Sequence, residues 1–301
     1  MFEDVPFLGA GLGYQADLHE QILANRDGID FVEVPIDQFL GNMPEWTNRL
    51  ADLKRTFTTV AHGIYMSLGD AKGAHLEYLD RAAPFIEALD PLVVSDHIDM
   101  GNVPDDEQGQ YFHGMPVPFT PEQAAVFRRN MDVFAERFRR PLLVENIFYK
   151  FVVPMPDSLA EPVFIGEMLR GTAHGLLLDV TNLCINAANF GFDPYAWLEQ
   201  APLERTVYIH VSGGEVRVGG RWDGKWVDSH SQPVPDVVWR MVEQVVAAAP
   251  VKGILLERDQ NYPPMAEMLA ELRIARQILA AASRPDPKQV VAPPGQPLAS
   301  G

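Results

Sequence analysis

Short apolar runs that end in a polar side chain recur along this chain. Leu176-Leu177-Leu178 stops at Asp179, and such a short continuous apolar run indicates a strand buried on both faces. Two earlier strands without this ending are predicted at Phe7–Gly11 and Asp30–Val34. The other predicted strands, each ending in His or Glu, are Thr58–His62, Leu92–His97, Leu142–Glu145, Val207–His210 and Ile254–Glu257.

Helical stretches separate these strands. Thr120-Pro121-Glu122-Gln123 marks a helix start, because Thr is a good N-cap, Pro suits the first helical position and Gln123 stands where a capping box needs it. Leu76–Leu89 is predicted to be helical with a break or kink at Pro84. The other predicted helices are Asp17–Ala24, Trp46–Leu53, Glu161–Leu169, Pro194–Leu198, Pro235–Ala248 and Met265–Ala282, and the helix that starts at Thr120 runs to about Arg139.

Strands and helices therefore alternate about eight times, which implies parallel strands joined by right-handed crossovers. That count predicts an α/β fold of the TIM (β/α)8 barrel type, with an open doubly wound sheet as the alternative. We expect one catalytic domain over residues 1–283 and a disordered, Pro-rich tail over residues 284–301. Residues 98–119 form a long polar loop, and the glycine-rich stretch Gly213–Lys225 is predicted to be an irregular loop or hairpin.

Composition narrows the class of partner. The 301 residues carry a formal net charge of -17, which argues against binding to a nucleic-acid backbone. Cys184 is the only cysteine, so an intramolecular disulfide is excluded, as suits a reducing cytoplasm. The N-terminus lacks the features of a signal peptide, and no apolar run reaches the length of a membrane span. We therefore expect a soluble cytoplasmic protein.

The polar strand ends carry the candidate chemistry. A barrel brings the carboxyl ends of all its strands to one face, so residues far apart in sequence meet there. Imidazole with carboxylate is a ligand set that suits Zn, Fe or Mn. Nine such donors are too many for one ion, so two or three ions that share bridging carboxylates are predicted. The candidate ligands are His62, His97, Glu145, Asp179, Asn182, His210, Asp228, His230 and Glu257.

Several other polar residues have plainer interpretations. His19 and His75 lie on or near helices and are predicted to be solvated, His113 lies in the long loop, and His174 precedes a strand at the wrong end of the barrel. Cys184 is expected in the core. Four further residues could orient a ligand without binding the metal themselves, namely Glu33, Asp96, Asp99 and Asp259, whereas Arg258 could act in the same way or pair with Asp259.

An ordered set of short segments resembles a known family. The chain is similar to the multinuclear non-heme iron-dependent oxidative enzymes, the group that contains the methanobactin-biosynthesis oxidase. The resemblance extends over about residues 7–280. The matching segments are Ser95-Asp96-His97, Val144-Glu145-Asn146, Leu178-Asp179-Val180-Thr181-Asn182, Ile209-His210-Val211-Ser212-Gly213, Asp228-Ser229-His230 and Leu256-Glu257-Arg258-Asp259.

The resemblance implies a barrel similar to xylose isomerase and endonuclease IV. It also implies two or three iron ions held by the candidate ligands, with Asp179, His210 and Glu257 in the middle of the cluster and in the catalytic role. The expected reaction is O2-dependent oxidation of cysteine in a ribosomally made precursor peptide, to an oxazolone with a thioamide in the methanobactin branch. A small partner protein that presents the peptide leader is expected as well.

Two departures from the family pattern concern the substrate. Gln15 stands where several relatives carry Arg, and Asp99-Met100 replaces apolar or aromatic residues. A divalent-metal (Zn or Mn) isomerase or phosphoesterase on the same barrel is the alternative function. An isomerase would need a lysine near the metals, and no lysine stands at a predicted strand end; an endonuclease would need a basic rim. A non-catalytic metal-binding protein is the third hypothesis.

Overall fold

Eight parallel strands close into a barrel in the order β1-β10-β7-β6-β5-β4-β3-β2. The structure is a computed structural model that describes residues 2, 4–40, 43–101 and 114–282. The closed barrel confirms the predicted TIM fold, and the open doubly wound alternative is wrong. The strands are β1 (Gly9–Gly13), β2 (Phe31–Pro35), β3 (Thr58–His62), β4 (Val94–His97), β5 (Leu142–Glu145), β6 (Gly175–Asp179), β7 (Thr206–Val211) and β10 (Gly253–Leu256).

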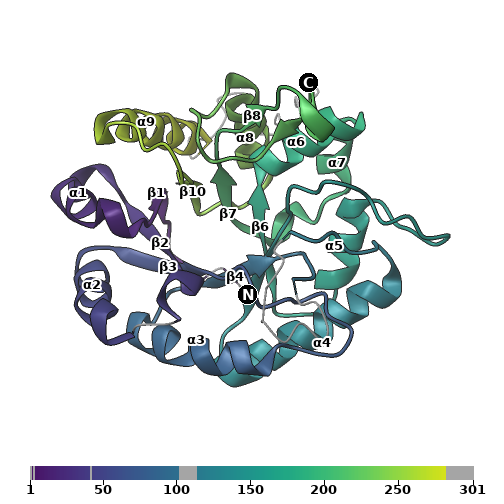
Figure 1. Cartoon of the computed structure of the whole chain (residues 1–301), viewed down its shortest axis with the longest axis horizontal. Helices are drawn as coiled ribbons and strands as arrows, with labels where there is room; N and C mark the ends of the chain where they lie inside the picture. Colours follow the sequence, from purple (N-terminus) through teal and green to yellow (C-terminus); the bar gives the residue numbers. More distant parts are fainter. Residues whose placement is uncertain (1, 3, 41–42, 102–113, 283–301) are drawn as a thin grey trace, which may run out of the picture.

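Helices form an outer ring around the strands (Figure 1). Their apolar faces and the outward-facing side chains of the strands make one continuous buried cluster. Among the described residues, no helix is long and apolar enough to cross a membrane. The α-helices are α1 (His19–Ala24), α2 (Met43–Thr56), α3 (Leu76–Leu89), α4 (Pro121–Phe138), α5 (Glu161–Leu169), α6 (Val180–Phe190), α7 (Pro194–Gln200), α8 (Asp236–Ala248) and α9 (Met265–Ala282).

The barrel interior is layered. Side chains alternate between the two faces of a strand, so residues two apart point into the barrel together. Phe31, for example, lies in the apolar layer, and Glu33 lies two positions further along the same strand. Gly11 is required opposite Phe31, because a Cβ at Gly11 would lie 2.4 Å from the Phe31 ring. The apolar layer consists of Leu8, Phe31, Val60, Val93, Leu143, Leu177, Val207, Tyr208 and Leu255.

Two local predictions about helices need correction. Thr120 caps α4 as predicted, since its hydroxyl accepts a hydrogen bond from the Gln123 amide at 3.2 Å. The Gln123 side chain does not complete the capping box, because it donates instead to the Gly69 carbonyl at 2.7 Å. Of the break or kink predicted at Pro84, the break is wrong, because α3 continues through Pro84 as one helix, and the kink stays a prediction.

Other differences concern segments near the carboxyl ends of the strands. The first strand begins two residues later than predicted, and helix α6, which sequence analysis missed, starts directly after Asp179. The predicted glycine-rich hairpin exists as the antiparallel pair β8 (Glu215–Val216) and β9 (Trp226–Val227). The tail over residues 284–301 lies outside the described residues, as do His113 and most of the long polar loop.

Candidate metal centre

A polar layer lies directly above the apolar layer of the barrel. Most of its members follow an apolar residue by two positions, as Glu145 follows Leu143 and Asp179 follows Leu177, whereas His97 follows Ser95. Parallel pairing puts neighbours of this layer side by side, with His97 opposite Glu145 and Asp179 opposite His210. The strand alternation therefore aims imidazoles and carboxylates into the mouth of the barrel.

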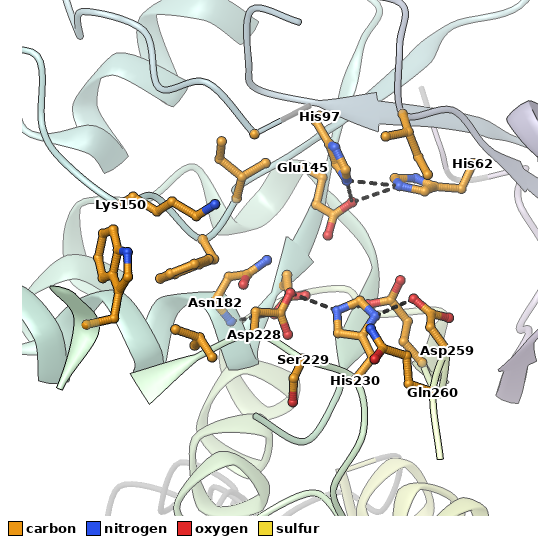
Figure 2. Close-up of a pocket in the computed structure, with 18 of the residues that line it drawn as sticks. His62, His97, Glu145, Lys150, Asn182, Asp228, Ser229, His230, Asp259 and Gln260 are labelled. Atoms are coloured by element: carbon orange, nitrogen blue, oxygen red, sulfur yellow. Dashed lines mark hydrogen bonds and ion pairs between the residues drawn. The ribbon is translucent and has the colours of Figure 1, made fainter. Parts of the chain in front are cut away.

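His62, His97 and Glu145 form the first group. The Nε2 atoms of His62 and His97 lie 3.1 Å apart, and Oε2 of Glu145 lies 3.4 Å from the first and 3.6 Å from the second. One ligand atom from each residue falls within 4.8 Å of the others (Figure 2). Two imidazoles and a carboxylate around one point form a typical site for a first-row transition metal.

Neighbouring polar side chains orient the two histidines of the first group. Nδ1 of His62 lies 2.9 Å from the Ser95 hydroxyl, which also lies 3.1 Å from the hydroxyl of Tyr208. Nδ1 of His97 lies 3.9 Å from Oδ2 of Asp99, so Asp99 is the acid placed beside that ring. Asp96 instead accepts hydrogen bonds from the Met66 and His97 amides, and this backbone role replaces the predicted contact with an imidazole.

Glu145, Asp179, His210 and Glu257 form the second group, again with ligand atoms within 4.8 Å of one another. Nδ1 of His210 lies 3.3 Å from Oε1 of Glu145 and 3.3 Å from Oε2 of Glu257. Glu145 thus points one oxygen at each group. A carboxylate in that position can bridge two metal ions, as sequence analysis predicted for the acids of this site.

Glu33 fixes the orientation of His210. Nε2 of His210 lies 3.0 Å from the Glu33 carboxylate, which also accepts a 2.5 Å hydrogen bond from the Tyr208 hydroxyl. A carboxylate only accepts, so Nε2 carries the proton and Nδ1 is directed to the centre. Burial lowers the pKa of His210, but Glu257, Glu33 and Glu145 together outweigh it and hold that pKa well above its usual range.

Asp179 is placed by two asparagines. The side chain of Asn146 donates to the Asp179 carbonyl at 2.8 Å and accepts from the Asp179 amide at 2.9 Å. Oδ1 of Asp179 caps helix α6 by accepting from the Asn182 amide at 2.6 Å. Asn182, the first-turn residue of that helix, donates its own amide group to the Asn146 carbonyl at 3.3 Å. The side-chain oxygen of Asn182 and Oδ2 of Asp179 remain available to a ligand.

Asp228 and His230 lie beside the second group. Nε2 of His230 is 2.7 Å from Oδ2 of Asp228 and 3.8 Å from Oε2 of Glu257. Nδ1 of His230 is held by Asp259 at 2.6 Å, and Asp259 accepts from the Gln15 side chain at 2.7 Å. Gln15 therefore supports a candidate ligand, whereas sequence analysis assigned it to the substrate side. Neither Asp228 nor His230 belongs to the two groups found among the described residues.

The residues present fit a multinuclear metal site. Four buried atoms there lack a hydrogen-bond partner among the described residues, namely Glu145 Oε2, Asp179 Oδ2, Asn182 Oδ1 and His210 Nδ1. Burial raises the pKa of Glu145 to about 7, and burial with the nearby Asp228 carboxylate raises the pKa of Asp179 well above its usual range. A buried carboxyl group is costly to ionise unless a cation lies beside it. The raised pKa values therefore mark acids that a bound metal ion would stabilise in their charged form.

The groups open into one cavity of about 430 Å³, a size common among ligand pockets. Besides candidate ligands, its lining includes Ile147, Phe148, Trp222 and the cations Lys150 and Arg217. Figure 2 shows Lys150 reaching towards the cavity from the segment that follows β5. Sequence analysis missed this lysine because it follows Glu145 by five residues.

Some of the remaining sequence predictions are wrong and others are confirmed. His19 was predicted to be solvated but is buried, with Nδ1 at 3.2 Å from the Tyr14 hydroxyl, and His75 is half-buried against the ring of Tyr78. His174 precedes β6 and accepts from the Leu142 amide, away from the centre as predicted. Arg258 pairs with Glu271 and not with Asp259. Cys184 lies in the core as predicted.

Comparison with known proteins gives a family and a fold. Residues 9–280 match the family described as "RiPP precursor modification enzyme MbnB/TglH/ChrH". A UPF0276 protein of Caulobacter vibrioides (strain NA1000 / CB15N) is 36% identical over 281 residues, which cover 93% of this chain and 97% of the relative. A UPF0276 protein of Pseudomonas aeruginosa PAO1 is 32% identical over 272 residues, with 90% and 92% covered.

Solved structures of lower identity share the fold alone. A xylose isomerase domain containing protein from Salmonella typhimurium has a TM-score of 0.60 at 13% identity, with 91% of this chain and 97% of that chain covered. Endonuclease IV from Thermus thermophilus has a TM-score of 0.52 at 16% identity, with 91% and 99% covered. The predicted likeness to these two barrels is confirmed. With its fold, its candidate metal centre and a family match over residues 9–280, this chain belongs to the MbnB/TglH/ChrH family of RiPP precursor modification enzymes.

Proposed function

We propose that this enzyme is a multinuclear iron oxidase that uses O2 to modify a cysteine residue of a ribosomally synthesised precursor peptide. The product would be of the oxazolone and thioamide type or a related one. The observation that supports this most is Glu145, whose two oxygens face two separate groups of ligands in one cavity. Adjacent metal ions suit a reaction that needs one position for a thiolate and another for O2.

The candidate ligands divide into three sets in this proposal. His62, His97 and Glu145 would hold one ion, and Asp179, His210 and Glu257 would hold the middle one, where the catalytic role is assigned. Iron held by these residues would supply the redox chemistry that couples oxidation of the substrate cysteine to reduction of O2. The third set, which would hold an outer ion, consists of Asn182, Asp228 and His230.

The chain's own residues perform the remaining tasks. Glu33 keeps the proton of His210 on Nε2, so Nδ1 stays directed at the metal. Ile147 and Phe148 supply apolar lining that limits water around the reacting thiol. A precursor peptide with a cysteine is the proposed substrate, and a small partner protein that recognises the peptide leader is the proposed partner.

The alternative is a zinc- or manganese-dependent isomerase or phosphoesterase on the same barrel. Lys150 weakens one argument against it, because a lysine does line the cavity. The xylose isomerase domain containing protein and endonuclease IV that share this fold are only 13% and 16% identical to this chain, so they support the fold and not a function. Family membership therefore favours the peptide substrate.

Metal analysis under anaerobic conditions tests the proposal. The purified protein is expected to contain two or three irons per chain, and Glu145→Ala or His210→Ala should lose iron and O2 consumption with a cysteine peptide while remaining folded. Glu161→Gln is a matched control, because Glu161 is an acid that accepts from Trp197 away from the centre. Stoichiometric zinc without iron, or full iron and activity in Glu145→Ala, would refute the assignment.

A further inference from the structure

We propose that Lys150 forms a subsite that binds a carboxylate of the substrate inside the cavity. The inference rests on the proposed function, since it assumes that a peptide enters this cavity, and it adds the chemical group that the peptide must carry. The carboxylate is either the C-terminal one or that of an Asp or Glu near the reactive cysteine.

The charges of the cavity single out Lys150. Two cations line it, and Arg217 is already paired with Glu215 at 2.8 Å. Among the residues that the structure describes, no hydrogen bond or ion pair engages the ammonium group of Lys150, and this residue is exposed. In a chain with a formal net charge of -17, a cation at the candidate active site without an acidic partner is available to an anionic ligand.

The backbone that carries Lys150 is fixed. The Tyr149 amide donates to the Asn186 side chain at 3.2 Å, and the same asparagine donates back to the Ile147 carbonyl at 2.9 Å. Asn146, one residue earlier, is bonded to the backbone of Asp179. Lys150 therefore extends from a backbone segment tied to helix α6 and to a candidate ligand, so the starting point of its side chain is fixed relative to the candidate ligands.

The chemistry of the group decides its ligand. An ammonium group has three donors and no lone pair, so Lys150 is not a metal ligand in this form. Its lining neighbours Ile147 and Phe148 offer no charge. An unmodified peptide offers carboxylates as its anionic groups, apart from the thiolate that the metals would take. One thiolate position and one cation in a 430 Å³ cavity thus define two contact points for a short peptide segment.

Binding of four small probes to the iron-loaded protein under anaerobic conditions tests the subsite. N-acetylcysteine is compared with its amide, and N-acetyl-Cys-Asp-amide is compared with N-acetyl-Cys-Asn-amide, by calorimetry. In at least one pair, the wild type should bind the probe with the carboxylate roughly three- to tenfold more tightly. Lys150→Gln should abolish this preference without changing the affinity of the uncharged probe, and Lys150→Arg should retain it. Arg217→Gln is the control cation of the same cavity.

The outcomes separate the two proposals. A preference in the first pair identifies the chain terminus, and one in the second pair identifies an acidic side chain. Equal affinities within both pairs, or a preference that survives Lys150→Gln, overturn the subsite. N-acetylalanine and its amide repeat the comparison without a thiol. If the cysteine probes bind no better than these and the Lys150-dependent preference remains, the subsite stands and the proposed thiolate chemistry fails.

Discussion

The substitution Glu33→Gln tests whether the buried acid behind His210 tunes the metal centre. Glu33 is 4% exposed and accepts from two donors, the Tyr208 hydroxyl and Nε2 of His210. Glutamine has nearly the same shape but one acceptor oxygen instead of two. Nε2 of His210 lies 3.0 Å from both Glu33 oxygens, and the Tyr208 hydroxyl donates to one of the same two oxygens. In glutamine one of these oxygens becomes an amide nitrogen, which places a donor against the Nε2 proton, and the negative charge disappears from both contacts.

The size of the effect follows from these contacts. A hydrogen bond to a charged group contributes about 1.5–3 kcal/mol. Loss of such a contact behind a metal-binding histidine typically reduces metal affinity by about 10- to 100-fold, or roughly 1.4–2.7 kcal/mol. The hydrogen-bond estimate and the metal-affinity estimate thus give a similar free energy. Glu33→Gln should therefore weaken metal binding at the second group by about one to two orders of magnitude.

Competition with a chelator under anaerobic conditions measures this affinity. Glu271→Gln is the matched control, because Glu271 is also an acid with two contacts, to Arg258 and the Val234 amide, but it touches no candidate ligand. The control should keep its metal. Wild-type affinity in Glu33→Gln, or an equal loss in Glu271→Gln, would show that the hydrogen bond to His210 does not set metal binding.

Two further predictions concern the protein without metal. Burial raises the pKa of Asp99 to about 7 and that of Glu145 to about 7. The folded state thus binds protons that the unfolded state releases, so stability should fall as pH rises from about 4.5 to 7, and saturating metal should reverse the trend. A melting temperature of chelator-treated protein that rises over this range would contradict the reasoning. Asn146→Ala should lower the free energy of unfolding by about 2–4 kcal/mol, because it leaves the buried amide and carbonyl of Asp179 without partners. Urea denaturation measures it, and a loss under about 0.5 kcal/mol would refute that role.

The strand ends were the most predictable part of the site. An apolar run that stops at an acid or a histidine is a local pattern, and the barrel follows from repeating it. The nine candidate ligands all lie at or near the mouth of the barrel, although their role as ligands stays a proposal. The alternation also contained the signal for Glu33, since it follows Phe31 by two positions as Glu145 follows Leu143.

Contacts between distant segments were beyond prediction. Sequence analysis assigned no element to the stretch directly after Asp179, yet helix α6 starts there, because Asp179 caps it and Asn146, which directly follows the neighbouring strand β5, fixes the Asp179 backbone. His19 looked solvated on its own short helix but is covered in the fold. Gln15 reaches Asp259 across 244 positions of sequence. The spacing of residues along the sequence gives no sign of any of these contacts.

The sequence by itself determined the eight barrel strands, most of the helices between them and the residue types at the mouth of the barrel, because hydrophobic periodicity acts over a few residues. Only the tertiary structure decided that Glu145 faces two groups of ligands, that Glu33 and Asp259 hold His210 and His230, and that Lys150 reaches the cavity. The physical reason is that hydrogen bonds and ion pairs act over about 3 Å. Whether two side chains come that close is set by the register and closure of the whole barrel.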